Sequence, residues 1–164
     1  MYIFCRLIAD ICKLTLSINY IKNFLYSHTK TQSHKEKMNE NEIGKIVVNT
    51  AVGLHKELGP GLLETVYEVI LMHKLKEQGL IVERQVAVPI VYDGIRFNEG
   101  FRIDLLVNSK VVIELKSVEK LHKSHKKQLL TYLKLKGCKL GLLLNFGESL
   151  MKDGISRVIN GEIA

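Results

Sequence analysis

The chain has 164 residues, of which 46% are hydrophobic and 25% are charged, and its formal net charge is +7. This length and composition predict a globular domain with its own core, and they exclude a disordered chain. The three cysteines, Cys5, Cys12 and Cys138, have neither the spacing of a zinc site nor that of a disulfide framework, which favours a protein of the reducing cytoplasm.

Residues 1–37 carry six Lys and Arg against two acids, a net charge of +4. Residues 1–26 are rich in Ile, Leu, Phe and Tyr, but charged residues interrupt them, so no stretch is long enough to span a bilayer. They also lack the ordered zones of a signal peptide, and an amphipathic surface-anchoring helix is an alternative. We predict that residues 1–37 are an N-terminal extension outside the core, with Met38 as the genuine start, and that residues 38–164 form the folded domain.

Apolar periodicity predicts two helices at the start of this domain. Apolar residues recur at helical spacing over residues 41–58, and a second helix is expected over residues 62–78. The intervening Gly59-Pro60-Gly61 breaks the chain. Residues 80–92 are rich in strand-forming residues and end at Asp93-Gly94, which is a tight-turn signal.

The next two apolar runs, residues 98–107 and 111–117, are joined by a short polar stretch and predict a β-hairpin. If residues 108–110 form a three-residue loop, Val107 pairs with Val111, and the two charged positions fall on one face. A two-residue loop would mix charge into both faces, which is unfavourable because a one-residue slip exchanges the faces of a strand. We therefore predict the three-residue loop.

This register gives the hairpin one aliphatic face and one charged face. The aliphatic face carries Ile103, Leu105, Val107, Val111, Ile113 and Leu115, and the other face carries Arg102, Asp104, Leu106, Val112, Glu114 and Lys116. Cross-strand neighbours lie roughly 5 Å apart at Cβ, so the two carboxylates would repel each other unless a proton or a divalent cation lies between them. Mg²⁺, with Mn²⁺ as a substitute, prefers such carboxylates together with water and phosphate oxygens.

The remaining elements follow from the same patterns. A helix is expected over residues 122–136, a buried strand over 140–146, and a short terminal helix over 155–159. These elements predict an α/β fold in the order α-β-β-β-α-β, with an extra N-terminal helix.

Two motifs resemble a known family. Asp104, followed ten residues later by Glu114-Leu115-Lys116 on a hairpin that precedes a helix, resembles the PD-(D/E)XK nuclease superfamily. Upstream, residues 61–67 carry a Gly-x-x-Glu-x-x-Tyr pattern that resembles the GxxExxY proteins. The resemblance covers residues 38–160, with Ile103 in place of the superfamily's proline. It implies a restriction-endonuclease-like core, in which a mixed four-stranded sheet is flanked by helices. It also implies Mg²⁺-dependent hydrolysis of phosphodiester bonds in DNA.

The resemblance also implies roles for individual residues. Asp104 and Glu114 would hold the metal, and Glu64 would add a metal-site carboxylate. Lys116 would position the attacking water, and Gln128 and Tyr132 would be directed at the site.

Read without the resemblance, Glu64 is a first-turn acid that complements the helix dipole, and Lys116 is a salt-bridge partner of an acid. Likewise, Gln128 would lie at the surface and Tyr132 at the edge of the core. Tyr67 would either bond a site carboxylate or pack with its hydroxyl at the surface.

Lysines follow the candidate site. Residues 116–139 hold eight lysines and one acid, which favours contact with a phosphate backbone, although a solvated helix face is the alternative. The backbone-contact candidates are Lys120, Lys123, Lys126 and Lys127. A homodimer is one expected arrangement, because many nucleases of this fold pair to cut two strands. Two rival interpretations are a catalytically silent nucleic-acid- or protein-binding module and a structural charge cluster closed by Lys116 and Arg102.

Overall fold

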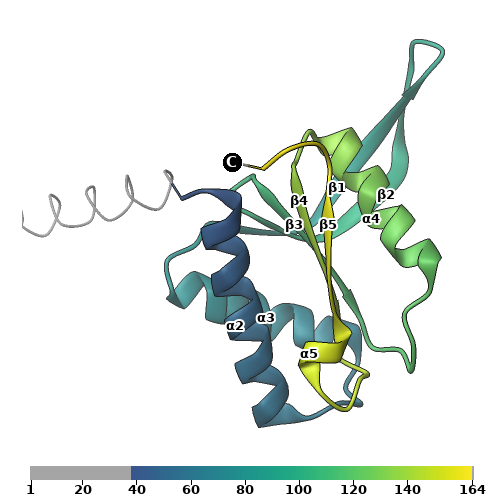
Figure 1. Cartoon of the computed structure of the whole chain (residues 1–164). Helices are drawn as coiled ribbons and strands as arrows, with labels where there is room; N and C mark the ends of the chain where they lie inside the picture. Colours follow the sequence, from purple (N-terminus) through teal and green to yellow (C-terminus); the bar gives the residue numbers. More distant parts are fainter. Residues whose placement is uncertain (1–37, 164) are drawn as a thin grey trace, which may run out of the picture. The chain divides into compact units, whose positions relative to one another are not determined.

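A five-stranded mixed sheet lies at the centre of residues 38–163, which are the residues that this computed structural model describes (Figure 1). The strands are β1 (Val82–Tyr92), β2 (Ile95–Val107), β3 (Val111–Lys116), β4 (Leu140–Asn145) and β5 (Ile155–Ile159). They lie in sequence order, and only β3 and β4 run parallel. The predicted extension over residues 1–37 lies outside the described residues.

Helices cover both faces of the sheet (Figure 1). The helices α2 (Glu40–Leu58) and α3 (Glu64–Glu77) pack on one face, and α4 (Lys123–Lys136) packs on the other. Asn39 begins α2 with a capping box, in which its side chain and that of Glu42 each accept a backbone N–H at 2.9 Å. Within the described residues, no helix is long and apolar enough to cross a membrane.

The predicted α/β class and helix-flanked mixed sheet are confirmed, but the strand count was wrong. The described part of the chain has five strands rather than four, because the terminal segment predicted as a helix forms β5 and pairs antiparallel with β4. Only the short α5 (Met151–Gly154) precedes it. A side chain at Gly154 would meet the Asn145 carbonyl oxygen at 2.2 Å, so glycine lets the chain approach β4 closely there.

The β2–β3 hairpin has the predicted register. Val107 pairs with Val111 and Leu105 with Ile113, and residues 108–110 form the loop. One part of the face prediction was wrong: Ile103 packs in the cluster beneath α4, whereas Leu105 packs in the cluster beneath α2 and α3. The alternation breaks at Asp104, opposite Gln85, whose φ of 53° lies in the left-handed region.

Candidate active site

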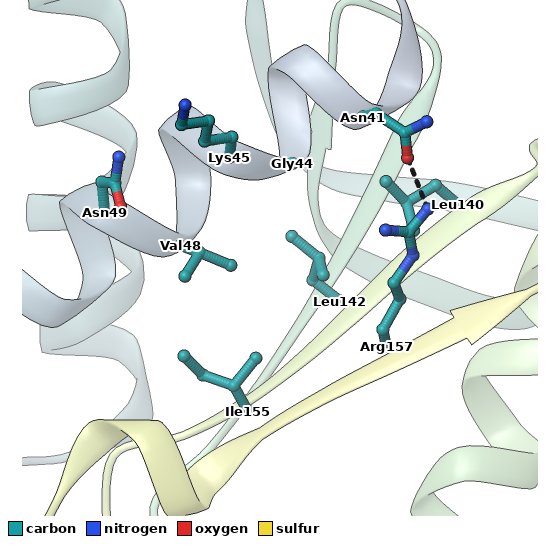
Figure 2. A pocket seen from close by; sticks show the side chains of 9 residues that line it. All are labelled: Asn41, Gly44, Lys45, Val48, Asn49, Leu140, Leu142, Ile155 and Arg157. Atoms are coloured by element: carbon teal, nitrogen blue, oxygen red, sulfur yellow. Dashed lines mark hydrogen bonds between the residues drawn. The ribbon is translucent and has the colours of Figure 1, made fainter. Parts of the chain in front are cut away.

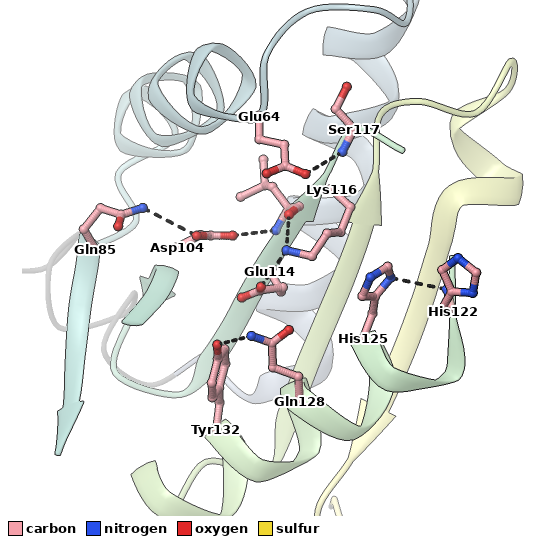
Figure 3. A network of polar contacts seen from close by, with 11 residues as sticks. Glu64, Gln85, Asp104, Glu114, Lys116, Ser117, His122, His125, Gln128 and Tyr132 are labelled. Atoms are coloured by element: carbon pink, nitrogen blue, oxygen red, sulfur yellow. Dashed lines mark hydrogen bonds and ion pairs between the residues drawn. The ribbon is translucent and has the colours of Figure 1, made fainter. Parts of the chain in front are cut away.

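Asp104 and Glu114 come from the adjacent strands β2 and β3 and lie in one polar network (Figure 3). The Oδ2 atom of Asp104 accepts the backbone N–H of Leu115 at 2.8 Å. The Oε1 atom of Glu114 accepts a hydrogen bond from Lys116 Nζ, also at 2.8 Å. The hairpin therefore brings two acids and a lysine together.

Glu114 is a buried carboxylate whose charge is only partly compensated by its neighbours. Its side chain is only 4% exposed, and its Oε2 atom is a buried oxygen without a hydrogen-bond partner among the described residues. Burial, reinforced by the negative charge of Asp104, raises the pKa of Glu114 from 4.5 to about 7, although Lys116 opposes the shift. A cation or a proton on Oε2 would compensate this buried charge.

The pKa values of Asp104 and Lys116 are also raised, for different reasons. Burial raises the pKa of Asp104, although the Leu115 N–H and the charge of Lys116 oppose the rise. Burial lowers the pKa of Lys116, but its bond to Glu114 and the surrounding carboxylates outweigh that effect and raise it. Lys116 Nζ also donates to the Leu115 carbonyl at 3.0 Å. Hydrogen bonds therefore hold the Lys116 ammonium group in place beside Asp104 and Glu114.

Glu64 connects the first turn of α3 to the end of β3 (Figure 3). Its Oε1 atom accepts the backbone N–H of Ser117 at 2.9 Å, and the Ser117 hydroxyl donates to the Leu62 carbonyl at 2.8 Å. Negative charge on Glu64 contributes to the raised pKa values of Asp104 and Glu114. Glu64 thus lies close enough to influence both acids.

Tyr67 is buried and its hydroxyl is hydrogen-bonded within a turn, an arrangement that differs from both predictions made from the sequence. Its side chain is fully buried and stacks on Phe146 with ring centroids 4.2 Å apart. The hydroxyl donates to the Gly59 carbonyl at 2.6 Å and accepts the Leu62 N–H at 3.2 Å. Gly61, with φ 105°, lies within this turn. In the Gly-x-x-Glu-x-x-Tyr pattern, the tyrosine therefore closes the turn that leads into the helix of Glu64.

The helix α4 presents polar side chains beside β3 (Figure 3). Gln128 donates to the Tyr132 hydroxyl. Burial and the charge of Glu114 raise the pKa of Tyr132, whereas burial and the charge of Lys116 lower the pKa of His125. His125, Gln128 and Tyr132 are spaced by three and four residues, so they share one helix face. Both Gln128 and Tyr132 therefore lie beside the acids, while the candidate lysines Lys120, Lys123, Lys126 and Lys127 are exposed.

No role was predicted from the sequence for Glu68, Arg84 and Gln85, which contribute to the network. The buried Glu68 accepts hydrogen bonds from Arg84 Nε at 2.7 Å and from Gln85 Nε2 at 2.8 Å. Gln85 Nε2 also lies 3.4 Å from Asp104 Oδ1. Glu68 had a signal, because it follows Glu64 by four residues on one helix face. Arg84 and Gln85 had none, because their roles depend on a contact with another element.

The donor set is suited to a hard divalent cation, which prefers carboxylate oxygens. In the described part of the chain, however, no three or more His, Cys, Asp or Glu side chains are grouped so that they could hold a metal ion. Asp104 and Glu114 alone would leave most coordination positions to water and phosphate, which is how Mg²⁺ is commonly bound. Metal binding by Asp104, Glu114 and Glu64 stays a prediction.

A separate cavity of about 270 Å³ lies between α2 and the strands β4 and β5 (Figure 2). Its lining combines apolar side chains such as Val48 and Leu142 with Lys45 and Arg157, and Arg157 donates to Asn41. No residue of the acidic network lines it. This cavity therefore does not contribute to the candidate active site.

The fold and the acid-and-lysine network define a nuclease-like protein. A family model described as the PD-(D/E)XK nuclease superfamily matches residues 41–158, which is most of the chain, and the chain belongs to that superfamily. A search of curated proteins and a search of solved structures gave no match. The narrower resemblance to the GxxExxY proteins stays a prediction.

Proposed function

We propose that the protein is a metal-dependent nuclease that hydrolyses phosphodiester bonds in DNA. The observation that carries this proposal is the buried, unpartnered Oε2 of Glu114 beside Asp104 and Lys116. Such an arrangement opposes folding unless a ligand compensates it, and natural proteins retain such groups at functional sites. Membership of a nuclease superfamily supports the same chemistry.

In this proposal Asp104 and Glu114 hold Mg²⁺ or Mn²⁺, and Glu64 completes or adjusts the site. The bound ion would polarise the phosphate and lower the pKa of a bound water. Asp104 is well prepared for this role, because the Leu115 N–H fixes Oδ2 while other lone pairs of the carboxylate remain. Glu114 offers the oxygen that has no partner among the described residues.

Lys116 would stabilise the negative charge that develops on the phosphate. An ammonium group has three donors, and Glu114 and the Leu115 carbonyl use two of them. The third could reach a phosphate oxygen or the attacking water. Because the pKa of Lys116 is raised, the group remains charged at neutral pH and acts electrostatically. Gln128 and Tyr132 border the same space and would orient the bound phosphate.

The finer predictions about substrate and assembly belong to this proposal as well. The exposed Lys120, Lys123, Lys126 and Lys127 support contact with a DNA backbone. A homodimer would present two such sites to two strands. A cytoplasmic location agrees with Cys138, which is a buried free thiol.

The test combines metal binding with cleavage. Thermal unfolding is measured with EDTA, Mg²⁺ or Mn²⁺, and both binding and strand cleavage are measured on single- and double-stranded DNA. We expect metal to raise the melting temperature of the wild type and to permit cleavage, and we expect Asp104→Ala/Glu114→Ala to lose both effects. Glu57→Ala/Glu83→Ala is the charge-matched control, because both acids are exposed outside the network.

The outcomes separate the rival interpretations. DNA binding without cleavage by the wild type would favour the catalytically silent binding module. If neither metal nor DNA changed any property of the wild type, the structural charge cluster would be the better interpretation.

A further inference from the structure

Gln85 has a left-handed backbone in the middle of a strand, with φ 53°. Non-glycine residues adopt this conformation rarely, and they persist in it only where surrounding contacts hold them. Gln85 lies between two registered pairs, Arg84 with Leu105 and Val86 with Ile103, so it stands across from Asp104. The irregular backbone therefore lies directly beside a proposed metal ligand.

This conformation changes where the Gln85 side chain points. Successive side chains of a regular strand point to opposite faces. Arg84 and Gln85 are consecutive, yet both donate to the same Oε1 atom of Glu68, at 2.7 and 2.8 Å. The left-handed backbone therefore brings the Gln85 amide to the face on which Glu68 and α3 lie.

The amide then bridges two carboxylates. Nε2 of Gln85 carries two hydrogens and donates to Glu68 at 2.8 Å. Its longer contact, at 3.4 Å, is with Asp104 Oδ1 (Figure 3). The other oxygen of Asp104 accepts the Leu115 N–H from β3. Asp104 is thus held from both neighbouring strands, and Glu68, which is buried and paired with Arg84, anchors the bridge.

We infer that Gln85 is a positioning residue, whose amide, anchored by Glu68, orients the Asp104 carboxylate for cation binding. Bulges and strained residues beside active sites commonly redirect a side chain in this way. The inference deepens the proposed function and rests on it for the identity of the ligand. The orientation of Asp104 itself can be measured without any metal.

The test uses the full chain with Gln85→Met, which keeps the length of the side chain and removes the amide donors. Gln78→Met is the matched control, because the Gln78 amide donates to Thr50 and Lys74 on the outside of α2 and α3. Two readouts are compared: the amide-proton chemical shift of Leu115 in the metal-free protein, and the dissociation constant for Mn²⁺. We expect Gln85→Met to move the Leu115 signal and to weaken Mn²⁺ binding by about tenfold or more. Gln78→Met should change neither.

Gln85→Gly keeps the test decisive if the methionine variant fails to fold, since glycine adopts a positive φ without strain. Gln85→Gly should also move the Leu115 signal and weaken Mn²⁺ binding, while its melting temperature stays near that of the wild type. An unchanged Leu115 signal and unchanged Mn²⁺ affinity in the folded Gln85 variants would overturn the inference. If the wild type itself bound no Mn²⁺, the proposed function would fail, while the Leu115 signal would still decide whether Gln85 orients Asp104.

Discussion

The β2–β3 hairpin has a regular half beside its loop, residues 105–113, and an irregular half farther from the loop, which contains Asp104 and Glu114. Beside the loop, the strands pair in regular register, and alternate side chains such as Val107 and Ile113 enter the buried cluster beneath α2 and α3. At Asp104 the alternation breaks, and hydrogen bonds from Leu115 and Gln85 replace apolar packing. The regular half stabilises the sheet, whereas the irregular half makes room for charge within it.

The same contrast holds for the energetic balance of the two halves. Burial of Ile113 removes apolar surface from water and favours folding. Burial of Glu114 leaves a carboxylate oxygen without a partner among the described residues and opposes folding in the absence of a ligand. In the metal-free protein we therefore expect truncation of Ile113 to lower stability and neutralisation of Glu114 to raise it.

The largest effect is expected in the regular half. Ile113→Ala should lower the free energy of unfolding by about 4 kcal/mol, because it removes a fully buried side chain and leaves a cavity. Urea denaturation checks this value. Ile159→Ala, on an exposed residue of the edge strand β5, is the control and should cost far less. A loss below 1 kcal/mol for Ile113→Ala would contradict the assignment of this half to the core.

The second effect concerns pH and the irregular half. Because burial and Asp104 raise the pKa of Glu114 from 4.5 to about 7, the folded state binds a proton more tightly than the unfolded state. The metal-free protein should therefore lose stability as pH rises from about 4.5 to about 7, by about 3 kcal/mol from this residue. Denaturation at several pH values in EDTA measures the loss.

Glu114→Gln isolates this contribution. Because the amide does not titrate, the stability of Glu114→Gln should fall much less as the pH rises over this range. Near pH 8 the variant should be more stable than the wild type. Glu119→Gln, at an exposed position, is the control and should follow the wild type. Identical pH profiles for Glu114→Gln and the wild type would contradict the raised pKa.

The third effect concerns the support of the irregular half. Arg84→Ala should lower the free energy of unfolding by about 2 kcal/mol, because it leaves the buried Glu68 without its guanidinium partner. This value lies between those of buried and surface ion pairs, since the Arg84 side chain is 39% exposed. Adding Glu68→Gln should recover part of the loss, since the buried charge is then removed. Thermal unfolding of the double-mutant cycle measures this coupling, and strictly additive losses would argue against the ion pair.

The two halves also differ in how much could be predicted from sequence. The register of the regular half follows from alternation, because a slip would have placed charges on both faces of the hairpin. The candidate site acids Asp104 and Glu114 follow from the same pattern. Gln85 could not be predicted, since its left-handed backbone and its side-chain direction depend on Glu68 in another element. The strand β5 was missed because a five-residue alternating segment becomes a strand only through its pairing with β4.

The smallest effect on stability is expected at the lysines of α4, where the comparison becomes one between the two ends of a helix. Lys126→Ala, near the start of α4, should change stability by less than about 0.5 kcal/mol. If Lys126 contacts a DNA phosphate, the variant should weaken DNA binding and reduce the slope of log affinity against log salt by about 0.9. Lys134→Ala, in the last turn of α4, is the control. If both variants bound DNA with the affinity and salt slope of the wild type, the start of α4 would not contact the DNA backbone. The acidic network would then have to bind its substrate without these lysines.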